Sequence, residues 1–305
     1  MELTIPLRGG GGEPVDLWRT LNSHGMTELP PMALDDPARA LEVTLPVDSG
    51  RARTVRISRG PRRTARVEIA GRPPGAKGAE QILRLVSHIL RLDEDLSGFY
   101  ELAREDPDLA WAAEGAGRMV RSATVFEDVV KTICTTNCTW AATERMVGAI
   151  VEHLGVRAPG APESGPRGRA FPSPEALAAA PVSFLRNVAR AGYRAAYLRS
   201  VASSVADGSI DLERLVAANE ELADDEVEAE LLALPGVGPY AAAHIMMTLG
   251  RHSRLILDSW TRPKYARLTG KRKVSDTAIE RRFRPYGKYA GLAFWLFLTR
   301  DWVEA

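Results

Sequence analysis

The stretch that decides the fold is Leu234–Ile245, which reads LPGVGPYAAAHI. Two glycines and two prolines fall within its first seven residues, and Ala241 completes the spacing of a G-x-G-x-x-A motif. That motif marks a dinucleotide-binding turn only where a strand precedes it. Here residues 225–233 have a helical pattern instead, with apolar side chains at Val227, Leu231 and Leu232. The sequence therefore argues against a dinucleotide-binding turn.

A helix, a Gly-x-Gly turn and a second helix begun by Pro239 predict a helix–hairpin–helix over about residues 225–249. Gly236 and Gly238 permit backbone conformations that side chains disfavour, and they let another backbone come close. Unpaired N–H groups at the start of the second helix then favour an anion. Such a turn can hold a DNA phosphate without reading base sequence. A plain helical corner is the alternative.

The composition is that of a globular protein. The chain has 305 residues, of which 45% are hydrophobic and 26% charged. It has neither an apolar run of about 18 residues nor the pattern of a secretory signal, so we expect a cytoplasmic protein with no membrane partner. We also expect a monomer. Residues 251–305 carry 13 Lys and Arg against 5 Asp and Glu, which indicates either a polyanion-binding face or a solvated mixed-charge surface.

The first 78 residues predict a small antiparallel β-domain. Apolar and polar residues alternate over 41–45, 53–57 and 66–69, between clusters of turn-forming residues. From Ala79 onward the pattern is almost entirely helical. We therefore expect an α+β fold, with a β-rich accessory domain at 1–78 and a mostly α-helical body at 79–305.

Capping signals and apolar periodicity locate the helices of the body. Thr124 and Glu127 have capping-box spacing, and Ser173 followed by Pro174 begins another helix. Between them, residues 155–172 read as an exposed, mobile loop. Helical patterns cover 183–206, 211–222, 225–233, 239–249, 259–268, 276–283 and 288–302.

Metal chemistry by side chains is not indicated. Cys134 and Cys138, the two cysteines, exclude an iron–sulfur cluster held by four thiolates and are expected to be buried and reduced. The five histidines show no metal-ligand spacing.

Asp258 is the candidate catalytic residue. It lies in Leu255–Trp260 (LILDSW), eighteen residues beyond Tyr240, after an apolar run and before another helix. Its side chain would either cap that helix or place a carboxylate in a pocket beside bound DNA.

Together these segments resemble the helix–hairpin–helix (HhH-GPD) DNA glycosylases, in the alkyl-purine and 8-oxoguanine branches without an iron–sulfur cluster. The resemblance spans roughly residues 80–302, and its segments come in the same order along the chain. They are the hairpin 234–245, the aspartate segment 255–260, the pocket-closing helix start 286–291 (YGKYAG), and two segments like those of the 8-oxoguanine branch, 133–137 (ICTTN) and 192–197 (GYRAAY). The resemblance implies a two-part helical body with an accessory β-domain.

The resemblance also implies roles for individual residues. Asp258 would stabilise the positive charge that develops on the sugar as the base leaves. Tyr193 would be a wedge stacked in the duplex, while Asn137 and Arg194 would hydrogen-bond the base left unpaired on the opposite strand. Core packing is the alternative for Tyr193, and a surface cation is the alternative for Arg194.

Strand-cutting members of the family carry a lysine just beyond the hairpin, where this chain has Tyr240. A phenol cannot form a Schiff base, so we expect a monofunctional glycosylase that leaves an abasic site. One alternative is a lyase that uses Lys264 or Lys131. Another is a non-catalytic DNA-binding protein, although phosphate binding alone does not require Asp258.

The base pocket is expected to be aromatic. Tyr240 and His244 share a helix face, and Phe294 and Trp295 fall where the family contacts the base, although these last two also fit simple core packing. Aromatic faces favour cationic rings and thus alkylated purines. The 8-oxoguanine branch reads the base with a polar amide residue around Phe294, which this chain lacks, yet the segments 133–137 and 192–197 favour that branch. A bulky modified base, as in phage DNA, is a third possibility.

The resemblance finally implies a Na⁺ or K⁺ ion on backbone carbonyls of the hairpin and no other cofactor. The carbonyls concerned are those of Leu232, Leu234 and Val237.

Overall fold

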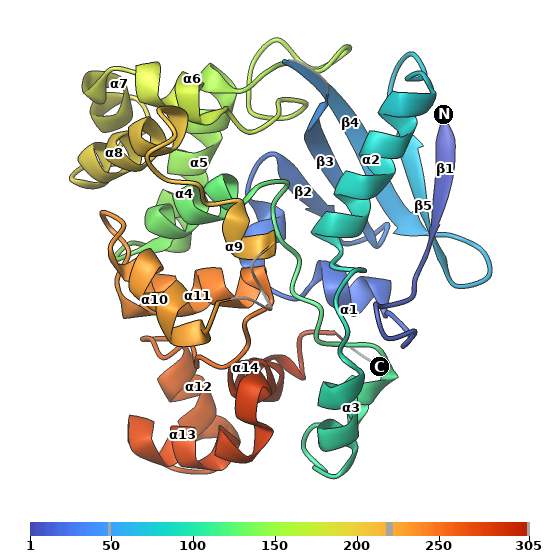
Figure 1. Cartoon of the computed structure of the whole chain (residues 1–305), viewed down its shortest axis with the longest axis vertical. Helices are drawn as coiled ribbons and strands as arrows, with labels where there is room; N and C mark the ends of the chain where they lie inside the picture. Colours follow the sequence, from blue (N-terminus) through green and yellow to red (C-terminus); the bar gives the residue numbers. More distant parts are fainter. Residues whose placement is uncertain (48–49, 218–221, 304–305) are drawn as a thin grey trace.

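The computed structural model describes residues 1–47, 50–217 and 222–303. An N-terminal antiparallel sheet is followed by a helical body, as predicted (Figure 1). The sheet has the order β1-β5-β4-β3-β2. Its strands are β1 (Glu2–Pro6), β2 (Met32–Asp35), β3 (Ala40–Val47), β4 (Arg51–Arg59) and β5 (Thr64–Ile69).

Helix α2 (Ala76–Ile89) lies over one face of the sheet (Figure 1). Val55 and Ile57 of β4 share a core with Ile82 and Val86 of α2, and all four side chains are fully buried. Burial of the alternate residues of a strand fixes its register. The predicted boundary at residue 78 falls inside α2, and the division of the chain into two domains stays a prediction.

The helical body follows the predicted caps. Thr124 Oγ1 accepts a hydrogen bond from the Glu127 N–H (3.2 Å), and Ser173 Oγ accepts one from the Ala176 N–H (3.3 Å). The helices are α1 (Leu17–Leu21), α3 (Ser97–Arg104), α4 (Val125–Thr135), α5 (Trp140–Leu154), α6 (Pro174–Ala179), α7 (Val182–Asn187), α8 (Arg194–Ala206), α9 (Arg214–Ala217), α10 (Asp224–Leu232), α11 (Pro239–Leu249), α12 (Thr261–Leu268), α13 (Asp276–Phe283) and α14 (Ala290–Thr299), with 3-10 turns η1 (Gly25–Glu28), η2 (Ala110–Glu114) and η3 (Arg284–Tyr289).

Two sequence expectations for the body need correction. The predicted helix 183–206 is broken into α7 and α8, because Arg190 and Gly192 adopt positive φ values of 57° and 58°. The predicted helix 211–222 is reduced to α9 among the described residues, and residues 218–221 lie outside them. In the 155–172 loop, Arg167 pairs with Glu42 of the sheet through two hydrogen bonds of 2.7 and 2.8 Å, and the mobility expected of this loop stays a prediction.

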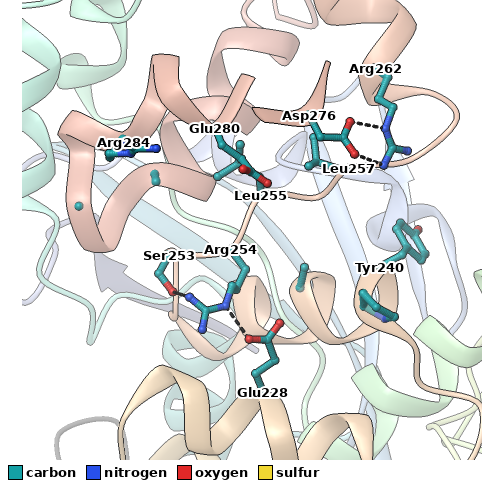
Figure 2. A pocket seen from close by; sticks show the side chains of 14 residues that line it. Glu228, Tyr240, Ser253, Arg254, Leu255, Leu257, Arg262, Asp276, Glu280 and Arg284 are labelled. Atoms are coloured by element: carbon teal, nitrogen blue, oxygen red, sulfur yellow. Dashed lines mark hydrogen bonds and ion pairs between the residues drawn. The ribbon is translucent and has the colours of Figure 1, made fainter. Parts of the chain in front are cut away.

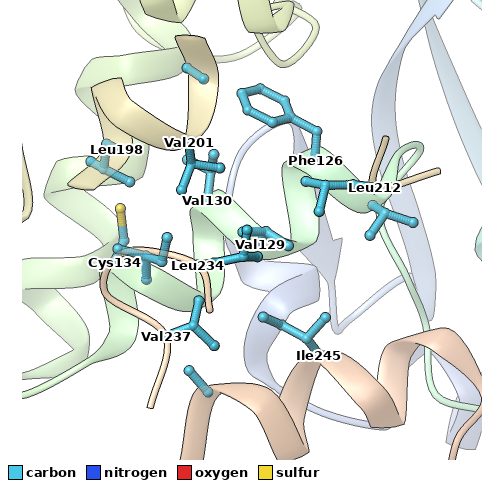
Figure 3. Packing of buried hydrophobic residues seen from close by; sticks show 14 of the residues in the cluster. Phe126, Val129, Val130, Cys134, Leu198, Val201, Leu212, Leu234, Val237 and Ile245 are labelled. Carbon is cyan, nitrogen blue, oxygen red and sulfur yellow. The ribbon is translucent and has the colours of Figure 1, made fainter. Parts of the chain in front are cut away.

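Helix α11 joins the two parts of the body. Ala242 and Ile245 pack in one hydrophobic cluster with α4, α5, α8 and α10, part of which Figure 3 shows. Ala243 and Met247 pack in a second cluster with α3, α12, α13 and α14. A helix that is apolar on all sides is stable only when it is buried on all sides. The alanine-rich sequence after the hairpin therefore places α11 at the centre, with only its N-terminus open.

Candidate active site

The hairpin and Asp258 line the same cleft, which encloses about 1290 Å³. Chain segments far apart in sequence meet there: the η1 turn, the end of α4, the start of α8, the hairpin, the segment before α12, α14 and the C-terminal turn. Its lining includes Gly25, Thr135, Asn137, Trp140, Tyr193, Tyr197, Gly236, Gly238, Tyr240, Asp258, Trp260, Trp295 and Trp302.

The two hairpin glycines are needed for different reasons. Gly236 has φ +85°, and a Cβ atom there would lie 2.8 Å from Cδ2 of Tyr197. Gly238 has φ −104° and ψ −176°, which side-chain-bearing residues adopt freely, so the expectation of a special backbone conformation at Gly238 was wrong. A Cβ at Gly238 would meet nothing within 4 Å. Its absence leaves the start of α11 open to an approaching group.

The N-terminus of α11 presents free backbone donors to this space. Gly238 is the N-cap and supplies no side-chain cap, and Pro239 follows it. The first backbone bond of the helix runs from the Ala242 N–H to the Gly238 carbonyl (2.9 Å). The N–H groups of Tyr240 and Ala241 precede that bond and lack intrahelical acceptors. This is the geometry of an anion site at a helix N-terminus.

Asp258 both caps α12 and faces the cleft. Its Oδ1 accepts hydrogen bonds from the N–H groups of Trp260 (2.8 Å) and Thr261 (2.7 Å). Its own N–H donates to Thr261 Oγ1 (2.8 Å). Both capping bonds use Oδ1, so Oδ2 is the oxygen that can face a bound group. The two roles foreseen for this residue are thus compatible.

A smaller pocket of about 110 Å³ lies beside Asp258. Tyr240, His244 and Trp295, three of the four predicted base-pocket residues, line it together with Asp258. Phe294 does not: it is fully buried and packs on Tyr265 and Phe283. The prediction for Phe294 is therefore corrected, because successive residues of α14 point in directions about 100° apart and the neighbouring Trp295 faces the pocket.

Sequence reasoning missed His24, which reaches this pocket from the N-terminal region. Its ring meets that of His244 edge to face at 5.7 Å. The Met26 N–H donates to His24 Nδ1 (3.2 Å), so the proton is on Nε2, which donates to the Val120 carbonyl (2.6 Å). Burial lowers the pKa of His24 to about 3 and that of His244 to about 4, although the Asp258 carboxylate opposes the latter shift. Both imidazoles are neutral near pH 7.

Tryptophans that sequence reasoning also missed form much of the cleft wall. Trp140, Trp260 and Trp302 are each about 40% exposed and all line the cleft. Exposed tryptophans gathered at one concave site are typical of binding surfaces. Because they are scattered over 163 positions of sequence, only their shared exposure in the fold reveals the cluster.

Of the three residues predicted to contact the DNA around the flipped base, two line the cleft and one does not. Asn137, with φ +46°, and Tyr193, which is 54% exposed, both line the cleft. Arg194 is buried instead, with its guanidinium bonded to Thr136 and stacked 4.5 Å from the Tyr193 ring centre. It thus supports the segment before Asn137 and is not free to bond a base, which corrects its predicted role.

No lysine lines the described part of the cleft. Lys131 is wholly buried and paired with Glu127 (2.7 Å), and Lys264 is paired with Asp301 (2.6 Å). Burial raises the pKa of Tyr240, so its phenol is neutral, and its hydroxyl lies 3.4 Å from Thr135 Oγ1. Cys134 is buried as expected, whereas Cys138 is exposed in the cleft, contrary to the prediction.

A second hollow of about 670 Å³ includes Tyr240, but not Asp258, in its lining (Figure 2). Its charged side chains are largely paired with one another: Arg254 with Glu228 (2.7 Å) and Arg262 with Asp276 (2.7 Å). These arginines are therefore engaged within the protein, and the basic excess of residues 251–305 is partly neutralised by ion pairs.

Among the described residues, no group of three or more His, Cys, Asp or Glu side chains could hold a metal ion. The hairpin offers backbone oxygens instead, the ligand type that hard cations prefer. The Leu234 carbonyl accepts a hydrogen bond from the Val237 N–H (3.1 Å), which leaves it a second lone pair. The Na⁺ or K⁺ ion expected on the carbonyls of Leu232, Leu234 and Val237 stays a prediction.

In the described residues, no helix is both long and apolar enough to cross a membrane. No protein-family model and no curated protein matches the sequence.

Solved structures do match. The chain is similar to 3-methyladenine DNA glycosylase from Archaeoglobus fulgidus, with a TM-score of 0.74 and 22% identity over 99% of this chain and 100% of that one. It is similar to MBOgg1, solved with a low-affinity DNA ligand, with a TM-score of 0.73 and 20% identity over 99% and 96%. It is also similar to the apo form of Clostridium acetobutylicum 8-oxoguanine glycosylase/lyase, with a TM-score of 0.73 and 19% identity over 97% and 95%. The chain therefore has the fold of the helix–hairpin–helix DNA glycosylases.

Proposed function

We propose that the chain is a monofunctional DNA glycosylase. It flips a modified base out of duplex DNA and hydrolyses the N-glycosidic bond, leaving an abasic site. The observation that carries this proposal is that Asp258 shares one cleft with the open N-terminus of α11. DNA held there by a phosphate would present an extruded nucleotide to the carboxylate. The structural neighbours include glycosylases for 3-methyladenine and 8-oxoguanine, which supports the proposal.

Asp258 acts on the bond that breaks. As the base departs with the bonding electrons, the sugar takes on positive charge, and a fixed carboxylate beside it lowers the barrier. The bonds to Oδ1 hold the carboxylate in place before the substrate arrives, so little reorganisation is needed.

We infer hydrolysis without strand cleavage because, in the described part of the chain, no side chain that could form a Schiff base is free at the site. Tyr240 occupies the position where the resemblance places a lysine in strand-cutting enzymes. Lys131 and Lys264 are engaged in ion pairs away from the cleft lining. An enzyme without a free amine at the sugar releases the base but leaves the strand intact.

Alkylated purines are the substrate class that the pocket favours. Trp295 and Tyr240 offer aromatic faces, Asp258 offers a negative charge, and the neutral His244 adds no positive charge. A cationic base is stabilised by each of these features. An 8-oxoguanine or a bulky modified base would instead need polar contacts or additional room, for which the 1290 Å³ cleft has space.

A release assay over duplexes with methylated, deaminated, oxidised or glycosylated bases tests this proposal. We expect release of alkylated purines without strand cleavage. Preferential release of an oxidised or glycosylated base would contradict the proposed substrate class but support the proposed base excision. Tight duplex binding with no release of any base would favour a non-catalytic DNA-binding protein. The bound cation, the monomeric state and the cytoplasmic location stay predictions.

A further inference from the structure

Three tryptophans form a packed cluster at the Asp258 end of the cleft. The ring centres of Trp260 and Trp295 lie 5.8 Å apart, those of Trp260 and Trp302 5.7 Å, and those of Trp295 and Trp302 5.9 Å. These distances and their tilted or edge-on angles are in the range of favourable aromatic pairs. Each ring is therefore held by the other two.

The cluster is joined directly to the carboxylate. The backbone N–H of residue 260 donates to Asp258 Oδ1, so a shift of the chain at Trp260 moves one of the two donors that orient the carboxylate. Trp295 is fixed independently, because its Nε1–H donates to the Ser23 carbonyl (2.7 Å). Trp302 is the member supplied by the C-terminal turn after α14.

An ion pair holds this turn against the helix that Asp258 caps. Nζ of Lys264, on α12, lies 2.9 Å from Oδ1 and 2.6 Å from Oδ2 of Asp301. The Trp302 N–H also donates to the Thr299 carbonyl at the end of α14 (3.0 Å). Lys264 is nearly buried, so its charge is poorly hydrated and depends on Asp301.

We propose that Lys264, Asp301 and Trp302 form a clasp that positions Asp258 through Trp260. The inference rests on the proposed glycosylase function and adds positioning residues to it. With the clasp closed, the Trp260 ring is packed on both neighbours and its backbone N–H points at Oδ1. With Trp302 removed, Trp260 keeps only Trp295, and the carboxylate loses its fixed direction toward the sugar.

The first test compares Trp302→Ala and Trp302→Phe on a lesion duplex that the wild-type protein excises. Displacement of a reacting group by about 1 Å can cost on the order of 100-fold in rate, so we expect Trp302→Ala to release the base about 10- to 100-fold more slowly in single turnover. Because Trp302 also lines the cleft, DNA affinity should fall as well, but by a smaller factor than the release rate. Trp302→Phe should recover most of the rate, and Trp18→Ala, on α1 beside the sheet, should behave like the wild type.

Two results would overturn the clasp. One is a wild-type release rate in Trp302→Ala. The other is a parallel loss of rate and affinity, which would make Trp302 a DNA contact instead of a positioning residue.

A second measurement separates the clasp from the proposed function. The amide resonance of Trp260 should shift in both Trp302→Ala and Asp301→Lys by NMR, and the double variant Asp301→Lys with Lys264→Glu should restore it. An unchanged Trp260 resonance in the single variants refutes the clasp even if the protein excises bases. Failure of the wild-type protein to release any base refutes the function while leaving this amide test intact.

Discussion

Replacing Gly238 with asparagine tests whether the hairpin holds a DNA phosphate. Residue 238 has φ −104°, and its Cβ would meet nothing within 4 Å, so the backbone and the surroundings accept a side chain. Asparagine is also a favoured N-cap, so the free energy of unfolding should change by only a few tenths of a kcal/mol. Its side chain would, however, occupy the space and bond the α11 N–H groups that the phosphate needs.

The size of the effect follows from the bonds that are lost. A hydrogen bond to a charged group contributes about 1.5–3 kcal/mol, so duplex affinity should fall roughly 10- to 100-fold. Undamaged and damaged duplexes should lose affinity equally, because a phosphate contact carries no base information. Since the donors are neutral, the dependence of log K on log salt should keep its slope. Fluorescence anisotropy over a range of salt concentrations measures each of these quantities.

Gly236→Ala is the matched control, because it changes the other hairpin glycine and is expected to lower stability. Its φ of +85° and the 2.8 Å approach to Tyr197 predict destabilisation by about 1–2 kcal/mol or more, seen as a lowered midpoint of thermal or denaturant unfolding. Unchanged duplex affinity in Gly238→Asn, or a loss of affinity confined to the damaged duplex, would refute phosphate binding by the hairpin.

Three further predictions concern the lyase question, pH and the support of Asn137. Borohydride should trap no covalent adduct of the wild-type protein on a damaged duplex but should trap Tyr240→Lys; a wild-type adduct would contradict the monofunctional assignment. Burial raises the pKa of Asp128 to about 6, so the folded state favours the protonated carboxyl, and the stability this contributes below the ordinary pKa is lost as pH rises through 6. Asp128→Asn should therefore raise the free energy of unfolding by on the order of 2 kcal/mol at pH 7–8 and not at pH 4. A pH-independent effect in denaturant unfolding would be inconsistent with this. Arg194→Met should lower the free energy of unfolding by about 1.5–3 kcal/mol, because it removes bonds to Thr136, and an unchanged unfolding midpoint would return Arg194 to the role of a free DNA contact.

Local sequence signals predicted the elements whose structure depends on neighbouring residues. The alternation at 53–57 gave β4, and Thr124 and Ser173 marked the starts of α4 and α6, because side-chain spacing and capping act within one turn or strand. The two edge strands, β1 and β2, were missed, because Glu2–Pro6 and Met32–Asp35 are short and give little alternation.

Only those site residues that belong to a local sequence motif could be predicted. The hairpin and Asp258 are close in sequence and meet in one cleft. His24 reaches the smaller pocket and Trp302 reaches the cleft from opposite ends of the chain, and no local pattern couples residues so far apart. The roles given to Arg194 and Phe294 came from the resemblance, which aligns positions along the chain but does not show which neighbours cover a side chain.

The central claim is that the Asp258 carboxylate drives base release, and Asp258→Asn tests it most directly. The amide oxygen of asparagine can still accept the N–H groups of Trp260 and Thr261, so the cap of α12 and the fold should persist. We expect single-turnover base release to fall by at least about 100- to 1,000-fold while duplex affinity is largely unchanged. Release at the wild-type rate, or an equal loss of rate and affinity, would contradict the assignment of Asp258 as the catalytic residue.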